Sequence, residues 1–559
     1  MNTKKMISFI MALALCMPIT TFSIVNNDNT NISVSADVTI TQNDFTFKVS
    51  SEDVATVTKY NGSSSNVTIP STVTADDGTV YTVSILGGAC FTNNLNISTV
   101  TIPKTITTWQ NNYDGTFEGC ISLSTVKFEE GSTLTNIGGN AFTGCTSLES
   151  IDIVNTVTSI DNNAFKDCSS LETINFQNGS VLDTINTNAF RGCTSIESLT
   201  IPKSVVNIGN SAFINCTSLT DVTFEEGSKC NIIEMGAFSG DSNLVSINLP
   251  SELNTIGIDA FRECNNLKSI IIPSSVENIK DTAFYDCEKL TSIVFEDGSN
   301  PTISSSVFAN CKSLKSITFA DTMASLGSIM FRGCTSLSTV KLPKNLSKIS
   351  SLAFKDCTSL KTVEIQEGTT LIDEYAFSGC TSLDNVVIPE SVNTINTSAF
   401  QDCTSLMNVS LLGTKTIQSS AFESCSSLSS VELGNNLKTV YSSAFRYCDN
   451  LKYVVIPASV KTIEDKAFGY SNKYNSETSN YLVSDFKIYG TVGSEAETYA
   501  TDNNITFIDV STGEVPTPTP TPTPPDSSNF VNGVYGDING DGVANIIDLV
   551  LMKKIILGV

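Results

Sequence analysis

A unit of 23 residues recurs along most of this chain, and that repeat limits the possible folds more than any other feature. Stretches that begin at Ala141, Ala164 and Ala353 read AFTGCTSLESIDI, AFKDCSSLETINF and AFKDCTSLKTVEI, within a consensus of A-F-x-x-C-x-S-L-x-x-V-x-I-P-x-S-V-x-x-I. Most steps are 23 residues long and a few early ones are 25. The sixteen anchor phenylalanines are Phe117, Phe142, Phe165, Phe190, Phe213, Phe238, Phe261, Phe284, Phe308, Phe331, Phe354, Phe377, Phe400, Phe422, Phe445 and Phe468.

The length and pattern of the repeat predict a solenoid. One unit of this size cannot bury its own apolar side, whereas stacked units share a continuous core and each contacts only its neighbours. The L-x-x-V-x-I part alternates apolar and polar residues and is rich in β-branched types, as strands are. The proline that follows ends the strand. We therefore predict a β-rich solenoid of about 16 repeats of 23–25 residues, with the strands paired in a parallel β-sheet.

These repeats resemble the BspA-like leucine-rich repeats of bacterial surface and secreted proteins, from about Val80 to Tyr470. The resemblance implies a leucine-rich-repeat solenoid that serves as a binding scaffold. It implies no particular ligand, because the class includes adhesins and many proteins of unknown role.

The two ends of the array differ from the repeat and are expected to cover its terminal apolar faces. Strand-like alternation appears in DFTFKVS at Asp44–Ser50, and after the last repeat we expect a helix over Glu495–Ala500 and a strand over Ile505–Val510. The predicted segments are a signal peptide at 1–36, an N-terminal β cap at 37–86, the repeats at 87–470, a small αβ C-terminal cap at 471–510, a Pro/Thr linker at 511–528 and one calcium-loop module at 529–559.

The N-terminus is typical of an export signal. Two lysines precede an apolar run at Met6–Met17 that is too short to span a bilayer. We place the cleavage after the small residues that end at Ala36, with a site near Ser23 as the alternative; lipid attachment at Cys16 is a minor third reading. No other segment is long and apolar enough for a membrane span, so the mature protein is expected outside the cell, free or held at the surface by a scaffold.

Composition excludes several classes of function. A net charge of −25 argues against nucleic acid and anionic membranes as partners, because phosphate groups would be repelled. The chain has no histidine, which excludes the usual Ser-His-Asp, Cys-His and His-zinc systems. Paired carboxylates could still hydrolyse glycosides, but none stands out, and there is no phosphate loop. We therefore predict a protein with no catalytic residues.

Fourteen of the 17 cysteines occupy one repeat position, and Asp241 takes that position in one unit. We interpret them as buried, reduced thiols that pack as small apolar groups. A disulfide ladder or a metal ladder is the alternative. The fourteen are Cys120, Cys145, Cys168, Cys193, Cys216, Cys264, Cys287, Cys311, Cys334, Cys357, Cys380, Cys403, Cys425 and Cys448.

The solvent side of the predicted sheet carries two rows of residues. The first row consists almost entirely of hydroxyl and amide side chains, which either hydrogen-bond to one another along the stack or contact a partner. The second row varies freely in residue type, which is expected both of an evolved binding surface and of neutral drift. Aromatic residues are nearly absent from these rows, which favours a protein partner over a polysaccharide, and Trp109 is expected to pack internally. The first row is Thr125, Ser150, Thr173, Ser198, Asp221, Ser246, Ser269, Ser292, Ser316, Thr339, Thr362, Asn385, Asn408, Ser430 and Tyr453. The second row includes Lys127, Asp152, Asn175, Ile271, Val294, Lys341, Glu364, Val387, Glu432 and Val455.

A calcium loop is predicted near the C-terminus, in DINGDGVANIID. Hard oxygen ligands at this spacing are what Ca²⁺ requires, with Gly542 at the sharp bend. Asp548 departs from the glutamate of an EF-hand. The predicted Ca²⁺ ligands are Asp537, Asn539, Asp541, Val543 through its carbonyl, Asn545 and Asp548.

This loop and the helix expected over Ile546–Leu557 resemble a dockerin repeat of type I, from about Tyr535 to Gly558. Dockerins are calcium-folded modules that attach secreted proteins to cohesin domains of cellulosome-type scaffoldins. The resemblance implies that Ile546, Ile547, Lys553 and Lys554 contact cohesin. Dockerins normally carry two repeats, and one of 24 residues cannot bury all of its apolar side chains. We expect a truncated module, with pairing to another chain or folding on a partner as alternatives.

Together these features predict a secreted, non-catalytic binding protein. Its solenoid would recognise an unknown partner, a protein by preference, and its Ca²⁺-dependent tail would bind a cohesin domain. Two alternatives stay open: a free or surface adhesin whose tail is vestigial, and an enzyme or inhibitor accessory to polysaccharide degradation.

Overall fold

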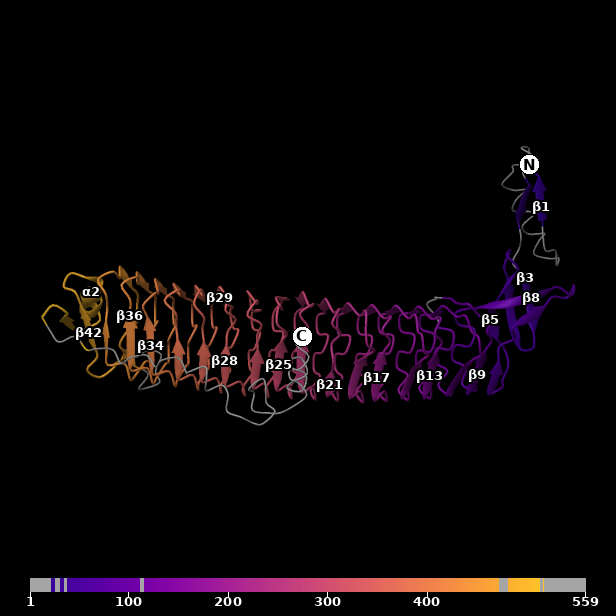
Figure 1. Ribbon diagram of the computed structural model, residues 1–559, viewed down its shortest axis with the longest axis horizontal. Coiled ribbons are helices and arrows are strands. Elements are labelled where there is room, and N and C mark those ends of the chain that lie inside the picture. Colours follow the sequence, from indigo (N-terminus) through magenta and orange to yellow (C-terminus); the bar gives the residue numbers. More distant parts are fainter. Residues whose placement is uncertain are drawn as a thin grey trace. The chain divides into compact units, whose positions relative to one another are not determined.

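The computed structural model describes residues 38–110, 115–471 and 481–512, Pro516, and the backbone of two short antiparallel strands, β1 (Phe22–Val25) and β2 (Asn31–Val34). The calcium-loop module at 529–559 lies outside these residues, as does the signal segment apart from those two strands. The chain forms two compact units, Met1–Ile196 and Glu197–Val559. Figure 1 labels many of their strands and colours them by position in the sequence. Within the described part, no helix has the length and apolar character that a bilayer span requires.

The first unit opens with a strand-rich region that leads into the repeats. Its sheet has the order β10-β8-β5-β4-β3, and alternation buries Phe45, Phe47 and Val49 on one side of β4. Strand β6 pairs in parallel with the first repeat strand, β9, so the stack already begins at Asn66, ahead of residue 87. The strands of this region are β3 (Val38–Gln42), β4 (Phe45–Val49), β5 (Val54–Tyr60), β6 (Asn66–Thr68), β7 (Thr72–Thr74) and β8 (Val80–Leu86).

Each repeat contributes one main strand from its L-x-x-V-x-I part, and these strands pair in parallel and in register in successive groups of two or three, which confirms the predicted parallel β-solenoid. Ser150 lies opposite Thr173 and Ile151 opposite Ile174, so like faces like along the stack. In the first unit the main strands are β9 (Thr99–Ile102), β11 (Thr125–Phe128), β13 (Ser150–Ile153) and β15 (Thr173–Phe176). In the second they are β17 (Ser198–Ile201), β19 (Asp221–Phe224), β21 (Ser246–Ile247), β23 (Ser269–Ile272), β25 (Ser292–Phe295), β27 (Ser316–Thr318), β28 (Thr339–Lys341), β30 (Thr362–Glu364), β32 (Asn385–Val387), β34 (Asn408–Leu411), β36 (Ser430–Leu433) and β38 (Tyr453–Val455).

A second, two-residue strand follows in most repeats, and the sequence analysis did not predict it. It forms where S-V-x-x-I ends, and its last residue is buried in nearly every copy. In the first unit these strands are β10 (Thr108–Trp109), β12 (Asn136–Ile137), β14 (Ser159–Ile160) and β16 (Thr184–Ile185). In the second they are β18 (Asn207–Ile208), β20 (Ile232–Ile233), β22 (Thr255–Ile256), β24 (Asn278–Ile279), β26 (Thr302–Ile303), β29 (Lys348–Ile349), β31 (Leu371–Ile372), β33 (Thr394–Ile395), β35 (Thr416–Ile417), β37 (Thr439–Val440) and β39 (Thr462–Ile463).

The turns between strands place residues in the left-handed region at two repeat positions, before A-F and before the cysteine. Glycine, asparagine and aspartate, which tolerate this conformation best, occupy many of these sites, as Asn163 and Asp167 do. Ile329 adopts the same conformation with φ of 59°, although a β-branched residue is strained there.

Replacing Ile329 with Asn is expected to raise the free energy of unfolding by about 1 kcal/mol, because the substitution relieves this backbone strain. Urea denaturation followed by circular dichroism would measure the change. The matched control is Asn163→Ile at the equivalent turn. This substitution should lower the free energy of unfolding by a similar amount. A less stable Ile329→Asn protein would contradict the assignment of strain.

The core is a column of stacked rings. In the first unit the centroids of neighbouring anchor phenylalanines lie 5.0–5.4 Å apart, and in the second unit they lie 5.0–5.8 Å apart. These rings are almost fully buried. Trp109, 2% exposed, packs edge-on against Phe117 and Phe142, which confirms its internal role.

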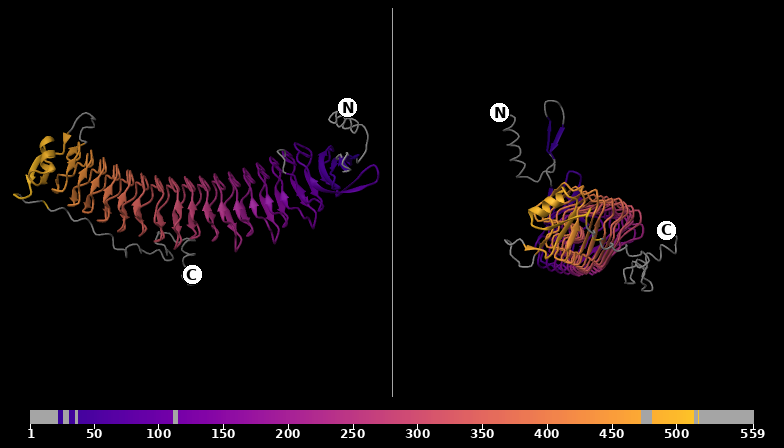
Figure 2. Two further views of the ribbon diagram at one scale, coloured as in Figure 1. Left: turned by 90° about the horizontal axis from the view of Figure 1, so that it is seen from above. Right: turned by 90° about the vertical axis from the view of Figure 1, so that its left-hand side faces the viewer.

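The last repeat of the second unit is followed by a short helix and two more parallel strands. Helix α2 (Glu495–Asp502) lies against the end of the stack (Figure 2), and Tyr499 brings its hydroxyl group to the backbone of Phe468. That hydroxyl accepts a hydrogen bond from Phe468 N (3.0 Å) and donates one to Phe468 O (3.1 Å). The remaining strands are β40 (Tyr470–Ser471), β41 (Tyr481–Leu482), β42 (Lys487–Gly490) and β43 (Thr506–Asp509), in a sheet of order β38-β42-β43 with a separate β40–β41 pair.

Candidate functional site

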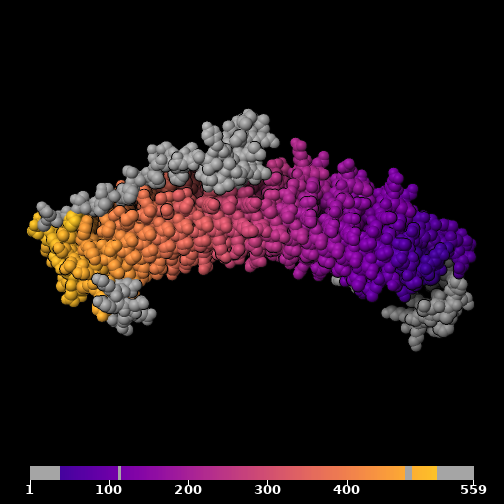
Figure 3. Space-filling view, turned by 90° about the horizontal axis from the view of Figure 1, so that it is seen from below, coloured from indigo at the N-terminus to yellow at the C-terminus, as the bar shows by residue number. Residues whose placement is uncertain are grey.

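The first and third residues of the main strands form a continuous surface on each unit, here called the strand face. Parallel pairing in register stacks Ser269, Ser292 and Ser316 in one row and Lys341, Glu364 and Val387 in the other. The apolar residues between them point into the core. In the space-filling view, the repeats of the second unit follow one another as an unbroken series of side chains (Figure 3).

Most residues of the two predicted rows are exposed or half-buried. Ser292, Val294 and Ser430 are buried instead, which the alternation did not predict. Neighbouring polar side chains contact one another in places. Ser246 Oγ donates to Asp221 Oδ1 (2.5 Å), and in the first unit Asn175 Nδ2 donates to Asp152 Oδ1 (3.0 Å).

Several charged side chains on the strand face of the second unit have partners within the chain. Lys341 Nζ lies 3.7 Å from Glu364 Oε1, and Gln366 Nε2 donates to the same oxygen (2.8 Å). Ser410 Oγ donates to Glu432 Oε2 (2.8 Å). Because exposed ion pairs stabilise weakly, these contacts leave the row free to meet a partner.

Two amide oxygens on this face lack a hydrogen bond. Asn385 Oδ1 and Asn408 Oδ1, on the adjacent strands β32 and β34, are buried from solvent and accept no hydrogen bond from the described residues. A buried acceptor without a donor is unfavourable by roughly 1–3 kcal/mol. These two oxygens therefore leave an unmet hydrogen-bonding capacity just beneath this part of the strand face.

The strand face of the second unit ends in two aromatic residues, Tyr453 of the predicted row and Tyr489, which the repeat pattern did not predict. Tyr489, on β42, lies opposite Val455, and its ring is 6.0 Å from that of Tyr453 in an edge-on arrangement. The residue was missed because β42 lacks the repeat consensus. Its IYG stretch does carry the apolar character of a strand.

The predicted cysteine column is built from buried thiols. Each of the sixteen cysteines in the described residues is buried and free of a disulfide. A thiol such as Cys145 Sγ donates to the carbonyl oxygen of the preceding anchor phenylalanine, Phe117 (3.1 Å). Burial raises the pKa of the Cys120 thiol to about 11 and holds the pKa values of Cys264 and Cys403 far above the usual range. These thiols are therefore neutral donors rather than nucleophiles.

Asp241, in the position of the missing cysteine, is fully buried. Its Oδ1 accepts a hydrogen bond from Cys216 N (2.7 Å), while Oδ2 accepts none from the described residues. Burial raises the pKa of this carboxyl well above its ordinary value, against the smaller effect of the backbone hydrogen bond.

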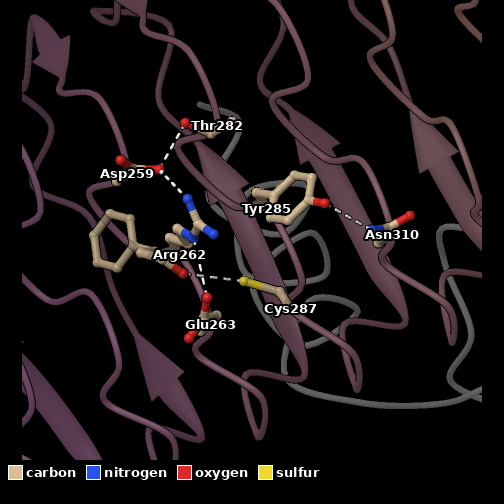
Figure 4. A network of polar contacts seen from close by, with 8 residues as sticks. Asp259, Arg262, Glu263, Thr282, Tyr285, Cys287 and Asn310 are labelled. Atoms are coloured by element: carbon tan, nitrogen blue, oxygen red, sulfur yellow. Dashed lines mark hydrogen bonds and ion pairs between the residues drawn. The ribbon is translucent and has the colours of Figure 1, made fainter.

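A polar network on another side of the second unit centres on Arg262 (Figure 4). Its guanidinium pairs with Asp259 (3.5 Å) and Glu263 (3.1 Å) and lies 5.2 Å from the centre of the Tyr285 ring. The phenol oxygen of Tyr285 accepts a hydrogen bond from Asn310 Nδ2 (3.0 Å). All four arginines of the chain follow an anchor phenylalanine, a regularity that sequence inspection could have found: Arg191, Arg262, Arg332 and Arg446. Because Asp259 and Glu263 neutralise its charge, Arg262 connects neighbouring repeats rather than forming a ligand site.

The predicted Ca²⁺ ligands and cohesin contacts all lie outside the described residues. Among the residues that are described, no group of three or more His, Cys, Asp or Glu side chains is arranged to hold a metal ion. The strand face is thus the described surface best placed for function.

A family model described as "BspA type Leucine rich repeat region (6 copies)" matches residues 84–220, 183–312, 231–361, 301–417 and 347–475. A leucine-rich-repeat protein of Bacteroides ovatus is 23% identical over 84% of this chain and 99% of its own, with a TM-score of 0.54. A leucine rich cell surface protein of Faecalibacterium prausnitzii is 26% identical over 67% of this chain and 95% of its own, with a TM-score of 0.37. The pneumococcal vaccine antigen PcpA is 19% identical over 85% of this chain and 99% of its own, with a TM-score of 0.41. No curated protein matches the chain.

Proposed function

The chain belongs to the BspA-type leucine-rich-repeat family, and from that premise we propose that it is a secreted, non-catalytic binding protein whose strand face recognises a protein partner. Solenoids of this kind are typically protein-binding surface proteins without catalytic activity. The observation that carries the proposal is the second row of the strand face, where Lys341, Glu364 and Val387 differ in charge and polarity on an otherwise uniform scaffold. A regular framework with one variable surface suits recognition of a particular partner.

We further propose that the tail attaches this protein to a scaffold. The spacing of oxygen ligands in DINGDGVANIID supports Ca²⁺ binding, and the following LVLMKK stretch supports a dockerin-like contact with cohesin. The Ca²⁺ would order the loop, and Ile546, Ile547, Lys553 and Lys554 would form the contact. The signal-like N-terminus is consistent with export.

The mature chain, residues 37–559, is expected to bind a cohesin domain in Ca²⁺ and to lose at least tenfold in affinity in EDTA. Changing both Asp537 and Asp541 to Ala should cause the same loss, because two charged ligands are removed. Calorimetric titration against a panel of cohesins would measure both, with Asp526→Ala, outside the loop, as the matched control.

Absence of Ca²⁺ uptake and of cohesin binding would contradict the attachment proposal while leaving the strand face as the functional surface. Turnover of xylan, cellulose or casein by the purified chain would contradict the non-catalytic assignment.

A further inference from the structure

A shallow apolar groove runs beside the C-terminal ends of two main strands in the second unit. It has a volume of about 450 Å³ and is lined by Val431 and Leu433 of β36, by Val455 of β38 and the following Ile456, and by Pro516. Pro516 is the first residue of the PTPTPTPTPP stretch at 516–525. The first residue of the Pro/Thr segment thus forms part of the wall of this groove.

Hydrogen bonds fix the course of the chain after its last described strand. Val510 N donates to Gly490 O beside the last strands, β42 and β43 (2.9 Å). The chain then turns, because Ser511 N donates to Asp509 Oδ1 (3.1 Å) and Thr512 N to Asp509 O (3.2 Å). Pro516 lines the same groove as residues of β36 and β38, strands that precede β42 in the stack.

A second groove of about 210 Å³ lies further along the same edge. It is lined by Ile365, Val387 and Pro389, among others, and Pro389 stands at the repeat position that Pro457 holds in the first groove. Asn385, whose Oδ1 lacks a hydrogen-bond donor, also lines it.

The geometry of a proline-rich segment fits this edge. Polyproline II has three residues per turn and a rise of about 3.1 Å, so one turn advances about 9.3 Å. Two repeats at a strand spacing of about 4.8 Å advance about 9.6 Å. Every third residue would therefore meet an equivalent position on every second repeat. The nine residues 517–525 span about 28 Å at this rise, which exceeds the four spacings, about 19 Å, from β38 to β30.

We propose that the Pro/Thr segment at residues 516–525 docks along the edge formed by the C-terminal ends of β30 to β38, within the same chain. By this pitch Pro516 packs beside Val455 and Pro522 beside Ile365, and each Thr between them supplies an unused N–H and hydroxyl, donors that Asn385 Oδ1 on β32 lacks. The segment is thus a strap that holds whatever follows it against the solenoid, instead of a free spacer. This inference is independent of Ca²⁺ and cohesin binding.

Photo-crosslinking within the full mature chain tests the strap. With p-benzoylphenylalanine in place of Thr519 or Thr521, irradiation and peptide mass spectrometry should locate crosslinks between residues 362 and 435, at a yield that does not change on dilution. Crosslinks scattered over both units, or crosslinks to a second copy that vanish on dilution, would overturn the proposal.

Groove substitutions supply the second measurement. Val387→Glu places a charge in the groove and should lower the crosslink yield from position 521, the position nearest to β32, at least fivefold. The matched control is Ile258→Glu, since Ile258 is apolar and 40% exposed and does not line either groove. Circular dichroism would confirm that both variants fold, and equal yields from them would overturn the proposal.

Discussion

Replacing Phe284 with alanine is expected to lower the free energy of unfolding by about 4 kcal/mol, because removing a large ring from a packed core leaves a cavity. Phe284 is fully buried, and its ring centroid lies 5.1 Å from those of both Phe261 and Phe308. Neighbouring repeats cannot collapse to fill the space, since the parallel strands on either side fix their separation. The stack therefore loses two ring contacts at once.

The region that loses stability distinguishes a solenoid, in which each repeat contacts only its neighbours, from a protein with one core shared by the whole chain. Repeats contact only their neighbours, so hydrogen exchange measured by mass spectrometry should show lost protection mainly in the repeats from Phe261 to Phe308. The matched control is Tyr285→Ala, the half-buried neighbour, which should cost about 1 kcal/mol. Uniform loss of protection in both units would contradict this account, and so would equal destabilisation by the two substitutions.

The sequence predicted the parts of the fold that rest on side-chain type and period. Phenylalanine, cysteine and leucine recur at fixed spacing because each faces the same core in every repeat, and alternation in L-x-x-V-x-I marks a strand with one buried side. The two-residue second strands, such as Thr394–Ile395, carry too little alternation to be recognised. They form because stacking brings identical backbone segments into register.

The backbone conformation of individual turns and the shape of the surface could not be predicted from the sequence pattern. Ile329 and Tyr447 are left-handed because neighbouring turns impose that geometry on them, against their own preference. Tyr489 joins the strand face through pairing with β38, although it lies beyond the last repeat. The grooves along the strand ends depend on how neighbouring repeats meet, which no single repeat reveals.

Asp241→Cys is expected to be more stable than the natural protein at pH 7, with a margin that shrinks as the pH falls. Burial raises the pKa of the Asp241 carboxyl in the folded chain, whereas in the unfolded chain it titrates near 3.9. The folded state therefore holds a proton that the unfolded state releases. The stability from Asp241 is fully present below the unfolded pKa and is lost as the pH rises toward the folded one, by about 1.4 kcal/mol per pH unit.

The substituted cysteine should keep this position neutral across that range and restore the column. Its thiol would donate to Phe213 O, as Cys264 Sγ donates to Phe238 O (3.2 Å), and no buried oxygen would be left without a partner. Asp241→Asn is the matched control, because it keeps an oxygen for Cys216 N but cannot ionise. In urea denaturation from pH 4 to pH 8, the difference in free energy of unfolding between the two variants should stay constant. The natural chain should become progressively less stable than both as the pH rises. If the three stability curves run parallel over that range, folding does not raise the pKa of the Asp241 carboxyl, and this account of the buried acid is wrong.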